Sequence, residues 1–200
     1  YRTRIVVENI HVPDIPEDFL RQFEVSYNII NYVRDRGFRV VVKDCSLGGK
    51  FPVVCVCFID QNTGRYHTHF GAYPIFEIAL ARALTETFQG RNISEIAAFT
   101  DFTRTGARDD MLLTMKHEFV RGTWEKPAGF FVGQPTYPFH DDVGFQGKNN
   151  KELLRECLAF FTDQGYQIMV RDGSSLGFHT YQVLIPGYSE VFTYRLNKKL

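Results

Sequence analysis

The 200-residue sequence has no excess of charge of either sign, because 23 Lys and Arg residues balance 23 Asp and Glu residues. Proteins that bind double-stranded nucleic acid usually carry a basic excess that displaces counterions from the phosphates. The sequence also lacks an apolar run of the roughly 20 residues that cross a bilayer. We therefore expect neither nucleic acid nor a membrane as a partner.

The familiar nucleotide and redox motifs are also absent from the sequence. It contains no P-loop, no G-x-G-x-x-G and no C-x-x-C pair. The four cysteines are Cys45, Cys55, Cys57 and Cys157. Cys55 and Cys57 lie two apart in an apolar segment, which predicts two small buried residues on one face of a strand rather than a redox pair. This use of cysteine is typical of a reducing compartment, and we expect a cytoplasmic protein.

What the sequence does have is an aromatic content of 15%, which favours a well-packed globular body. Its hydrophobic periodicity alternates between helix and strand and indicates an α+β (α/β) fold. Residues 126–150 are rich in Gly and Pro, and we expect a long irregular connection there. The predicted helices cover 16–34, 74–90, 109–120 and 151–162, and the predicted strands cover 38–43, 53–59, 66–70, 166–171 and 180–185.

One segment of the sequence occurs twice. Residues 35–46, DRGFRVVVKDCS, resemble residues 163–174, DQGYQIMVRDGS. An apolar helix precedes each copy and a second strand follows it. Such a match can arise by chance in any mixed fold, but the shared Gly, aromatic, basic residue, Asp and Ser favour two related helix–strand–strand units, with the sheet packed against helices.

A polar stripe follows the helix predicted over 74–90. Arg82, Glu86 and Gln89 are spaced four and three apart, so they share one face, while Phe76, Leu80, Ala83 and Leu84 form the apolar face. The stripe has two interpretations. It is either a solvated face with an Arg82–Glu86 ion pair, or a site in which a carboxylate holds Mg²⁺ and a guanidinium binds phosphate.

His67 and His69 lie two apart on a predicted strand, so both side chains face the same side. Two histidines can ligate a metal, as in a metal-dependent hydrolase. No third residue follows at a spacing typical of metal ligands. The alternative interpretation is that His67 and His69 are half-buried structural residues.

Two segments carry a resemblance to a known family. Residues 70–91, FGAYPIFEIALARALTETFQGR, resemble the signature of the YcaO family, in which a Gly-rich turn precedes Pro-Glu, Ala-Leu-x-Arg-Ala-Leu-Thr-Glu, Gln and Arg. Residues 185–192, IPGYSEVF, resemble the Pro-Gly-x-Ser-Glu segment that follows a late strand of the same domain. The sequence is thus similar to the C-terminal portion of a YcaO domain. We expect a single partial YcaO-like domain over residues 1–200, cut from a longer protein, since the sequence starts at Tyr1 without a Met.

The resemblance implies ATP and Mg²⁺ as cofactors and a peptide or protein as substrate, whose backbone amides are activated in cyclodehydration, thioamidation or ribosomal-protein modification. It implies part of a longer enzyme that is inactive as this chain alone. A separate partner protein and a homodimer both stay open, and no catalytic residue is assigned. Carried over position by position, the resemblance gives Gly71, Arg82, Glu86, Gln89 and Arg91 for the nucleotide and Glu86, Glu77 and Glu190 for the metal.

The sequence also departs from the family pattern. The early Ser-Gly segment and the first acidic helix are not visible, and Gln182 stands where many members carry Arg. Glu77 precedes Glu86 by nine residues, which places the two on opposite faces of a helix and favours a helix-end or cleft-edge charge for Glu77. A non-catalytic scaffold module that binds a peptide or protein is therefore the alternative function.

Overall fold

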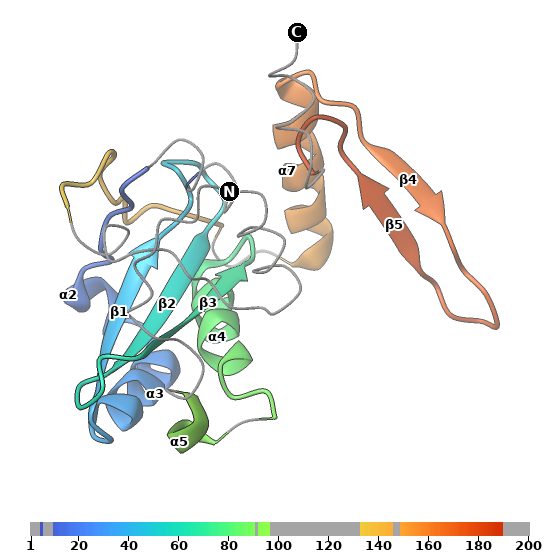
Figure 1. Cartoon of the computed structure of the whole chain (residues 1–200). Helices are drawn as coiled ribbons and strands as arrows, with labels where there is room; N and C mark the ends of the chain where they lie inside the picture. Colours follow the sequence, from blue (N-terminus) through green and yellow to red (C-terminus); the bar gives the residue numbers. More distant parts are fainter. Residues whose placement is uncertain (1–4, 6–9, 91, 97–132, 146–148, 190–200) are drawn as a thin grey trace, which may run out of the picture. The chain divides into compact units, whose positions relative to one another are not determined.

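The computed structural model describes residues 5, 10–90, 92–96, 133–145 and 149–189 (Figure 1). The chain divides into two compact units, residues 1–146 and 147–200, each of which is described by itself. The helix expected over 109–120 lies outside the described residues. Within them, no helix is both long and apolar enough to cross a membrane.

The first unit is built on a three-stranded antiparallel sheet. Its strands are β1 (Phe38–Asp44), β2 (Val53–Asp60) and β3 (Tyr66–Ala72), in the order β1-β2-β3. The central strand β2 is buried from Val53 to Phe58, as its continuous apolar sequence requires. All three strands lie where the sequence predicts them.

Helices α3 (Glu24–Arg34) and α4 (Phe76–Glu86) cover one face of this sheet (Figure 1). A short α2 (Glu17–Leu20) precedes them, and α5 (Ile93–Ile96) follows. The main core lies under the helices and contains Ile30, Val33, Val40, Val42, Val54, Val56, Phe58, Phe76, Leu80 and Leu84. A smaller core on the other face contains Ile5, Val12, Cys45, Val53 and Cys55.

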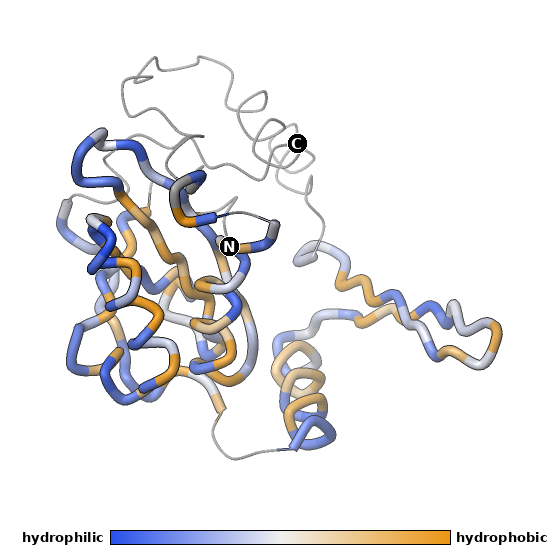
Figure 2. Tube along the Cα trace, turned by 90° about the horizontal axis from the view of Figure 1, so that it is seen from below, coloured by the Kyte–Doolittle hydropathy of each residue, from blue (hydrophilic) through white to orange (hydrophobic). Residues whose placement is uncertain are grey.

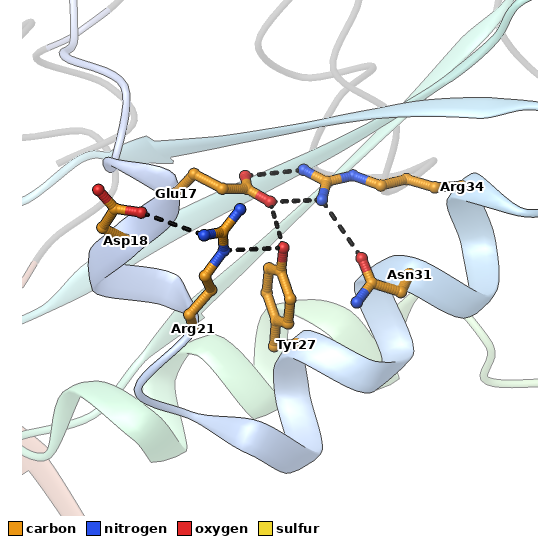
Figure 3. A network of polar contacts seen from close by, with 6 residues as sticks. All are labelled: Glu17, Asp18, Arg21, Tyr27, Asn31 and Arg34. Atoms are coloured by element: carbon orange, nitrogen blue, oxygen red, sulfur yellow. Dashed lines mark hydrogen bonds and ion pairs between the residues drawn. The ribbon is translucent and has the colours of Figure 1, made fainter.

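The prediction of one helix over 16–34 was wrong, because the chain bends at residues 21–23. Phe23 has φ −107° and ψ 75°, outside the helical region. A straight helix would hold Glu17 and Arg34 about 25 Å apart. Instead the Arg34 guanidinium donates two hydrogen bonds to the Glu17 carboxylate, and the Tyr27 hydroxyl donates a third at 2.7 Å (Figure 3). This network fastens α2 across α3.

The helix predicted over 74–90 is also shorter in the structure. α4 ends at Glu86, and the next turn tightens, with the Phe88 N–H donating to the Thr85 carbonyl at 3.0 Å. Thr85 and Thr87 each donate a side-chain hydroxyl to a carbonyl one turn earlier, a bond that competes with regular helix. Gly90 then adopts φ +67° and closes the segment.

Residues 133–145 contain no helix or strand, which agrees with the irregular connection expected there. They are nevertheless packed against the sheet and helices. The Tyr137 hydroxyl donates to the Asp44 carbonyl at 2.6 Å, the Thr136 N–H donates to the His11 carbonyl at 2.8 Å, and Phe139 packs edge-on against Phe19.

The second unit consists of α7 (Asn150–Asp163) and a hairpin of β4 (Met169–Asp172) and β5 (Tyr181–Leu184). The Asn149 side chain caps α7 by accepting from the Glu152 N–H at 3.0 Å. Every residue of both strands is exposed. Figure 2 shows hydrophobic residues along α7 and along the hairpin.

The repeat seen in the sequence recurs in the structure. α3, β1 and β2 have the same order and antiparallel pairing as α7, β4 and β5. Gly37 (φ +86°) and Gly165 (φ +78°) both end the helix in the left-handed conformation. After each first strand, an Asp carboxylate accepts from the N–H of the Ser two residues later, at 2.8 Å in both copies. The expected pair of helix–strand–strand units in an α+β fold is confirmed.

Candidate functional site on helix α4

Helix α4 presents the polar stripe that the sequence predicts. Phe76, Ala79, Leu80, Ala83 and Leu84 are buried, as the apolar face requires. Arg82 and Glu86 lie one turn apart on the exposed side. The helix is therefore fixed by its buried face, while these two side chains remain available to a ligand.

Gly71 sets how closely α4 approaches the sheet. A Cβ at this position would lie 1.9 Å from the Ala79 carbonyl oxygen and 2.6 Å from the Ala83 nitrogen, both of them backbone atoms of α4. Only glycine permits such a contact without a shift of the helix. Packing thus explains the glycine, and its contact with a nucleotide stays a prediction.

Arg82 is oriented by the last residue of β3 and by Tyr73, which follows it. Its Nη1 donates to the Ala72 carbonyl at 3.3 Å, and its guanidinium lies 6.0 Å from the centre of the Tyr73 ring. Among the ion pairs between described residues, none joins Arg82 to Glu86. The solvated face of the first interpretation is present, since both side chains are exposed, but the Arg82–Glu86 ion pair is not formed. The guanidinium keeps further N–H groups that pair with no carboxylate of its own helix.

The remaining predicted site residues are not gathered around Glu86 on one helical stripe. Gln89 is exposed in the tightened turn after α4, where its N–H donates to the Glu86 carbonyl at 3.4 Å. Glu77 is exposed in the first turn, where a negative charge favours the helix dipole. Because nine residues separate the two carboxylates, they lie on opposite sides of the helix. Arg91 and Glu190 lie outside the described residues.

The chemistry of this stripe fits part of a magnesium–nucleotide site. Mg²⁺ takes one or two carboxylates together with phosphate oxygens and water, and Glu86 supplies one exposed carboxylate. Arg82 supplies a guanidinium one turn away, of the kind that binds phosphate. In the described part of the chain, no group of three or more His, Cys, Asp or Glu side chains is placed to hold a metal ion. The described residues therefore complete no such site by themselves.

His67 and His69 share one face of β3, as predicted, and their Nε2 atoms lie 2.5 Å apart. His67 is only 2% exposed and His69 is half-buried. Among the described residues, no third His, Cys, Asp or Glu side chain completes a metal-binding group with this pair, so the three-ligand centre of a metal-dependent hydrolase is not formed there.

Cys55 and Cys57 are buried side chains, as the sequence predicts. Cys45, Cys55 and Cys57 are all buried, and none of them forms a disulfide bond. Burial raises the pKa of the Cys45 and Cys57 thiols well above the ordinary value. A thiol with a raised pKa is a poor nucleophile, so these two residues act as small hydrophobic side chains.

Sequence reasoning missed a buried polar cluster at the end of β1. Lys43 Nζ lies 2.9 Å from Asp14 Oδ1, although Lys43 is only 5% exposed. The neighbouring Asp44 carboxylate accepts from the N–H and the hydroxyl of Ser46, at 2.8 and 3.0 Å. Burial is the largest influence on Asp44 and raises its pKa. The residues of this cluster come from distant segments and a tight turn. Helix and strand periodicity therefore could not predict that they meet.

Comparison with known proteins identifies the family of this chain. Residues 2–189 match the family model described as YcaO cyclodehydratase, ATP- and Mg²⁺-binding. The chain belongs to the YcaO family. The expected membership of the YcaO family is thereby confirmed.

Two curated relatives have similar sequences. The chain is 29% identical over 191 residues to the ribosomal protein S12 methylthiotransferase accessory factor YcaO of Escherichia coli. It is 28% identical over 193 residues to an uncharacterised protein of Haemophilus influenzae. Each alignment covers 96% of this chain and 32% of the relative. The chain thus spans about a third of the length of the curated relatives that it matches.

Two solved structures share the YcaO-type fold. A heterocyclase in complex with substrate and cofactor superimposes with a TM-score of 0.61 at 14% identity, covering 90% of this chain and 23% of that one. The heterocyclase TruD gives a TM-score of 0.58 at 14% identity, covering 90% and 24%. At this identity the likeness shows the fold alone, and it confirms the α+β fold class.

Proposed function

We propose that this chain contributes helix α4 to the Mg²⁺–ATP site of a YcaO-type enzyme that modifies peptide or protein backbones. The observation that supports the proposal is the exposed pair of Arg82 and Glu86, set one turn apart on a helix that is fixed to the sheet through Gly71. The family description, ATP- and Mg²⁺-binding, names the ligands that this pair of side chains suits.

Each polar residue of the site has a proposed task. Glu86 ligates Mg²⁺ through its carboxylate, and Arg82 neutralises phosphate charge while its bond to the Ala72 carbonyl holds it in place. Gln89, Gly71 and Arg91 lie near the nucleotide. Glu77 and Glu190 are proposed as further acidic contributors, with Glu77 serving a different part of the cleft from Glu86.

Bound ATP would supply the phosphoryl group that turns a poor leaving group, an amide oxygen, into a good one. The task of this chain is then to orient the phosphates and to offset the negative charge that develops during phosphoryl transfer. Whether the product is an azoline or a thioamide is decided by the nucleophile, for which no residue of this chain is proposed.

The whole-protein context belongs to the same proposal. The substrate is a peptide or protein, the compartment is the cytoplasm, and the missing acidic ligands come from polypeptide beyond the described residues. That polypeptide is the remainder of a longer enzyme, since the curated relatives are about three times as long as the matched region. A partner protein or a second copy of the chain is the other source to be tested.

Phosphate release from ATP tests the enzymatic proposal. The longest natural polypeptide that contains residues 1–200 is assayed with Mg²⁺, with and without Glu86→Gln. We expect the substitution to slow release by about 100-fold or more, the scale set by losing one group that stabilises transition-state charge. The matched control is Glu24→Gln, at an exposed carboxylate in the first turn of α3. Equal rates for all three proteins would contradict the proposal.

A scaffold module is the second candidate function, and one observation favours it. The hairpin of the second unit exposes large apolar side chains, including Val170 (60%), Phe178 (74%), Tyr181 (61%) and Val183 (56%). Exposed apolar surface of this kind is typical of sites that bind a peptide or protein. If the chain is a scaffold, it should bind unstructured peptides without ATP, which fluorescence anisotropy would detect. The double substitution Tyr181→Ser and Val183→Ser should abolish this binding. Capture that requires Mg²⁺–ATP and Glu86 would contradict it.

A further inference from the structure

The internal repeat gives each residue of the β4–β5 hairpin a counterpart in the first unit. Val42 in β1 pairs with Val56 in β2, and at the equivalent position Val170 in β4 pairs with Val183 in β5. Val42 and Val56 are buried in the main core, whereas Val170 and Val183 are both exposed. The same face is therefore part of a core in the first unit and open surface in the second.

Tyr181 extends this exposed face. It occupies the position of buried Val54, since each of the two pairs with the Asp that ends the preceding strand. Side chains alternate along a strand, so Tyr181 and Val183 share one face and Gln182 lies on the other. We call the three exposed side chains Val170, Tyr181 and Val183 the hairpin face. They lie on the hairpin whose hydrophobic residues Figure 2 shows.

The first unit shows which elements cover such a face. There α3 packs on β1, α4 packs on β2, and β3 pairs with the second edge of β2. The second unit has a sheet of β4 and β5 alone, and its described residues contain no counterpart of β3 or α4. A two-stranded hairpin is marginally stable in water, and a third strand or a packed helix is needed to stabilise it.

The edge of β5 is the one suited to a third strand. β5 contains no charged residue from Tyr181 to Leu184, whereas β4 ends in Arg171 and Asp172. Charged side chains are a common protection of an edge strand against pairing, so β5 is the less protected edge. The choice agrees with the first unit, where the second strand of the repeat is also the one that gains a neighbour.

We propose that the hairpin face is a docking surface for a strand and an amphipathic helix supplied by the remainder of a longer protein. The strand pairs antiparallel with β5, as β3 pairs with β2, and the helix lays its apolar side on the hairpin face, as α4 does on β2. The chain spans 32% of each curated relative, so the rest of such a polypeptide is long enough to supply both elements. The inference does not rest on the nucleotide site, and its test needs no ATP.

Hydrogen exchange followed by mass spectrometry tests the proposal on this chain and on the longest natural polypeptide that contains it. We expect the amides of Tyr181–Leu184 to exchange at least about 100-fold more slowly in the longer protein, because a strand inside a packed sheet opens only with its neighbours. The amides of buried β2 should be protected in both proteins. Equally fast exchange of β5 in the two proteins would overturn the proposal.

Two substitutions in β5 test which face is covered. Val183→Glu places a carboxylate on the hairpin face, and in the longer protein it should return β5 to fast exchange, since burying an unpaired charge is costly. Gln182→Glu adds the same charge to the opposite face and should leave the protection in place. Circular dichroism establishes that both variants are folded. Protection that survives Val183→Glu would contradict docking on this face.

Other occupants of the hairpin face give different results. If a second copy of the chain covers it, the 200-residue chain by itself should gain protection of β5 as its concentration rises. If a free peptide covers it, β5 of the longer protein should exchange fast until the peptide is added. Either result would overturn the proposal, whereas protection that is independent of concentration and confined to the longer protein would support it.

Discussion

The α-carbon of Gly71 in β3 lies against the backbone of Ala79 in α4, with room for a hydrogen atom but not for a methyl group. Gly71→Ala should therefore push the helix away from the sheet. We expect it to lower the free energy of unfolding by at least about 2–3 kcal/mol, the upper range for overpacking, because the obstructing atoms are backbone. Urea unfolding followed by circular dichroism measures the loss.

Gly173→Ala is the matched control for this prediction. A Cβ at residue 173 meets the side-chain hydroxyl of Thr180 at 3.2 Å, and a side chain can move aside. We expect a cost below about 1 kcal/mol. Equal urea midpoints for the two variants would show that α4 does not depend on the close approach at Gly71.

The Glu17 carboxylate should make stability depend on acid pH. Its bonds from Arg34 and Tyr27 lower its pKa from 4.5 to about 2. A group with a lowered folded-state pKa stabilises the protein fully above its unfolded pKa, and the contribution is lost as the pH falls from about 4.5 to 2. The two side chains of the ion pair are 39% and 32% exposed, so solvent screening limits the gain at neutral pH to about 1 kcal/mol.

Glu17→Gln should remove this contribution and flatten the stability curve between pH 5 and pH 2. Thermal unfolding at a series of pH values measures the effect. Asp18→Asn is the control, because the Asp18 side chain is 93% exposed and its only described ion pair is with exposed Arg21. A Glu17→Gln curve parallel to that of the parent would mean that the network in Figure 3 does not hold α2 in solution.

Replacing Thr68 with an apolar residue of the same shape should stabilise the folded protein. Its side-chain oxygen is buried and, of the described residues, it alone has a buried side-chain polar atom without a hydrogen-bond partner. Thr68→Val keeps the branched shape that suits a strand and removes the unsatisfied hydroxyl, which favours folding by about 1 kcal/mol. The urea midpoint should rise, whereas Thr85→Val, which removes a hydroxyl bonded to the Ala81 carbonyl, should not raise it.

The duplicated Asp–Ser turn offers a comparison within one chain. Ser46→Ala deprives the buried Asp44 carboxylate of one of its two bonds from Ser46, and we expect a cost of about 1–3 kcal/mol. Ser174→Ala acts on exposed Asp172, whose pKa the Ser174 bonds lower, and should destabilise the protein less than Ser46→Ala does. Hydrogen exchange of the two turns distinguishes them, and equal effects would mean that burial of Asp44 is not maintained in solution.

The sequence was informative wherever local pattern determines structure. The buried valines of β1, the Pro74 and alanine content of α4 and the repeated Gly–aromatic–Asp–Ser segment each predicted the element that is present. Local pattern failed at the bend before Glu24 and at the end of α4, because a bond between Glu17 and Arg34 and the hydroxyl bonds of Thr85 and Thr87 override periodicity.

The site was predicted less completely than the fold. The spacing of Arg82 and Glu86 correctly placed both on the exposed side of one helix. Their partners could not be predicted, since the bond from Arg82 to the Ala72 carbonyl depends on how the loop at Tyr73 folds. Convergence of the His67 and His69 nitrogens likewise depends on side-chain torsions that no spacing specifies.

Calorimetric titration with ATP in the presence of Mg²⁺ tests the central claim most directly. It is performed on this chain and on the longest natural polypeptide that contains it, each with and without Glu86→Ala, with Glu24→Ala as the control. We expect the longer protein to bind Mg²⁺–ATP, Glu86→Ala to abolish binding, and Glu24→Ala to leave it unchanged. If neither protein binds Mg²⁺–ATP although both are folded, or if binding survives Glu86→Ala, the assignment of α4 to a nucleotide site is contradicted.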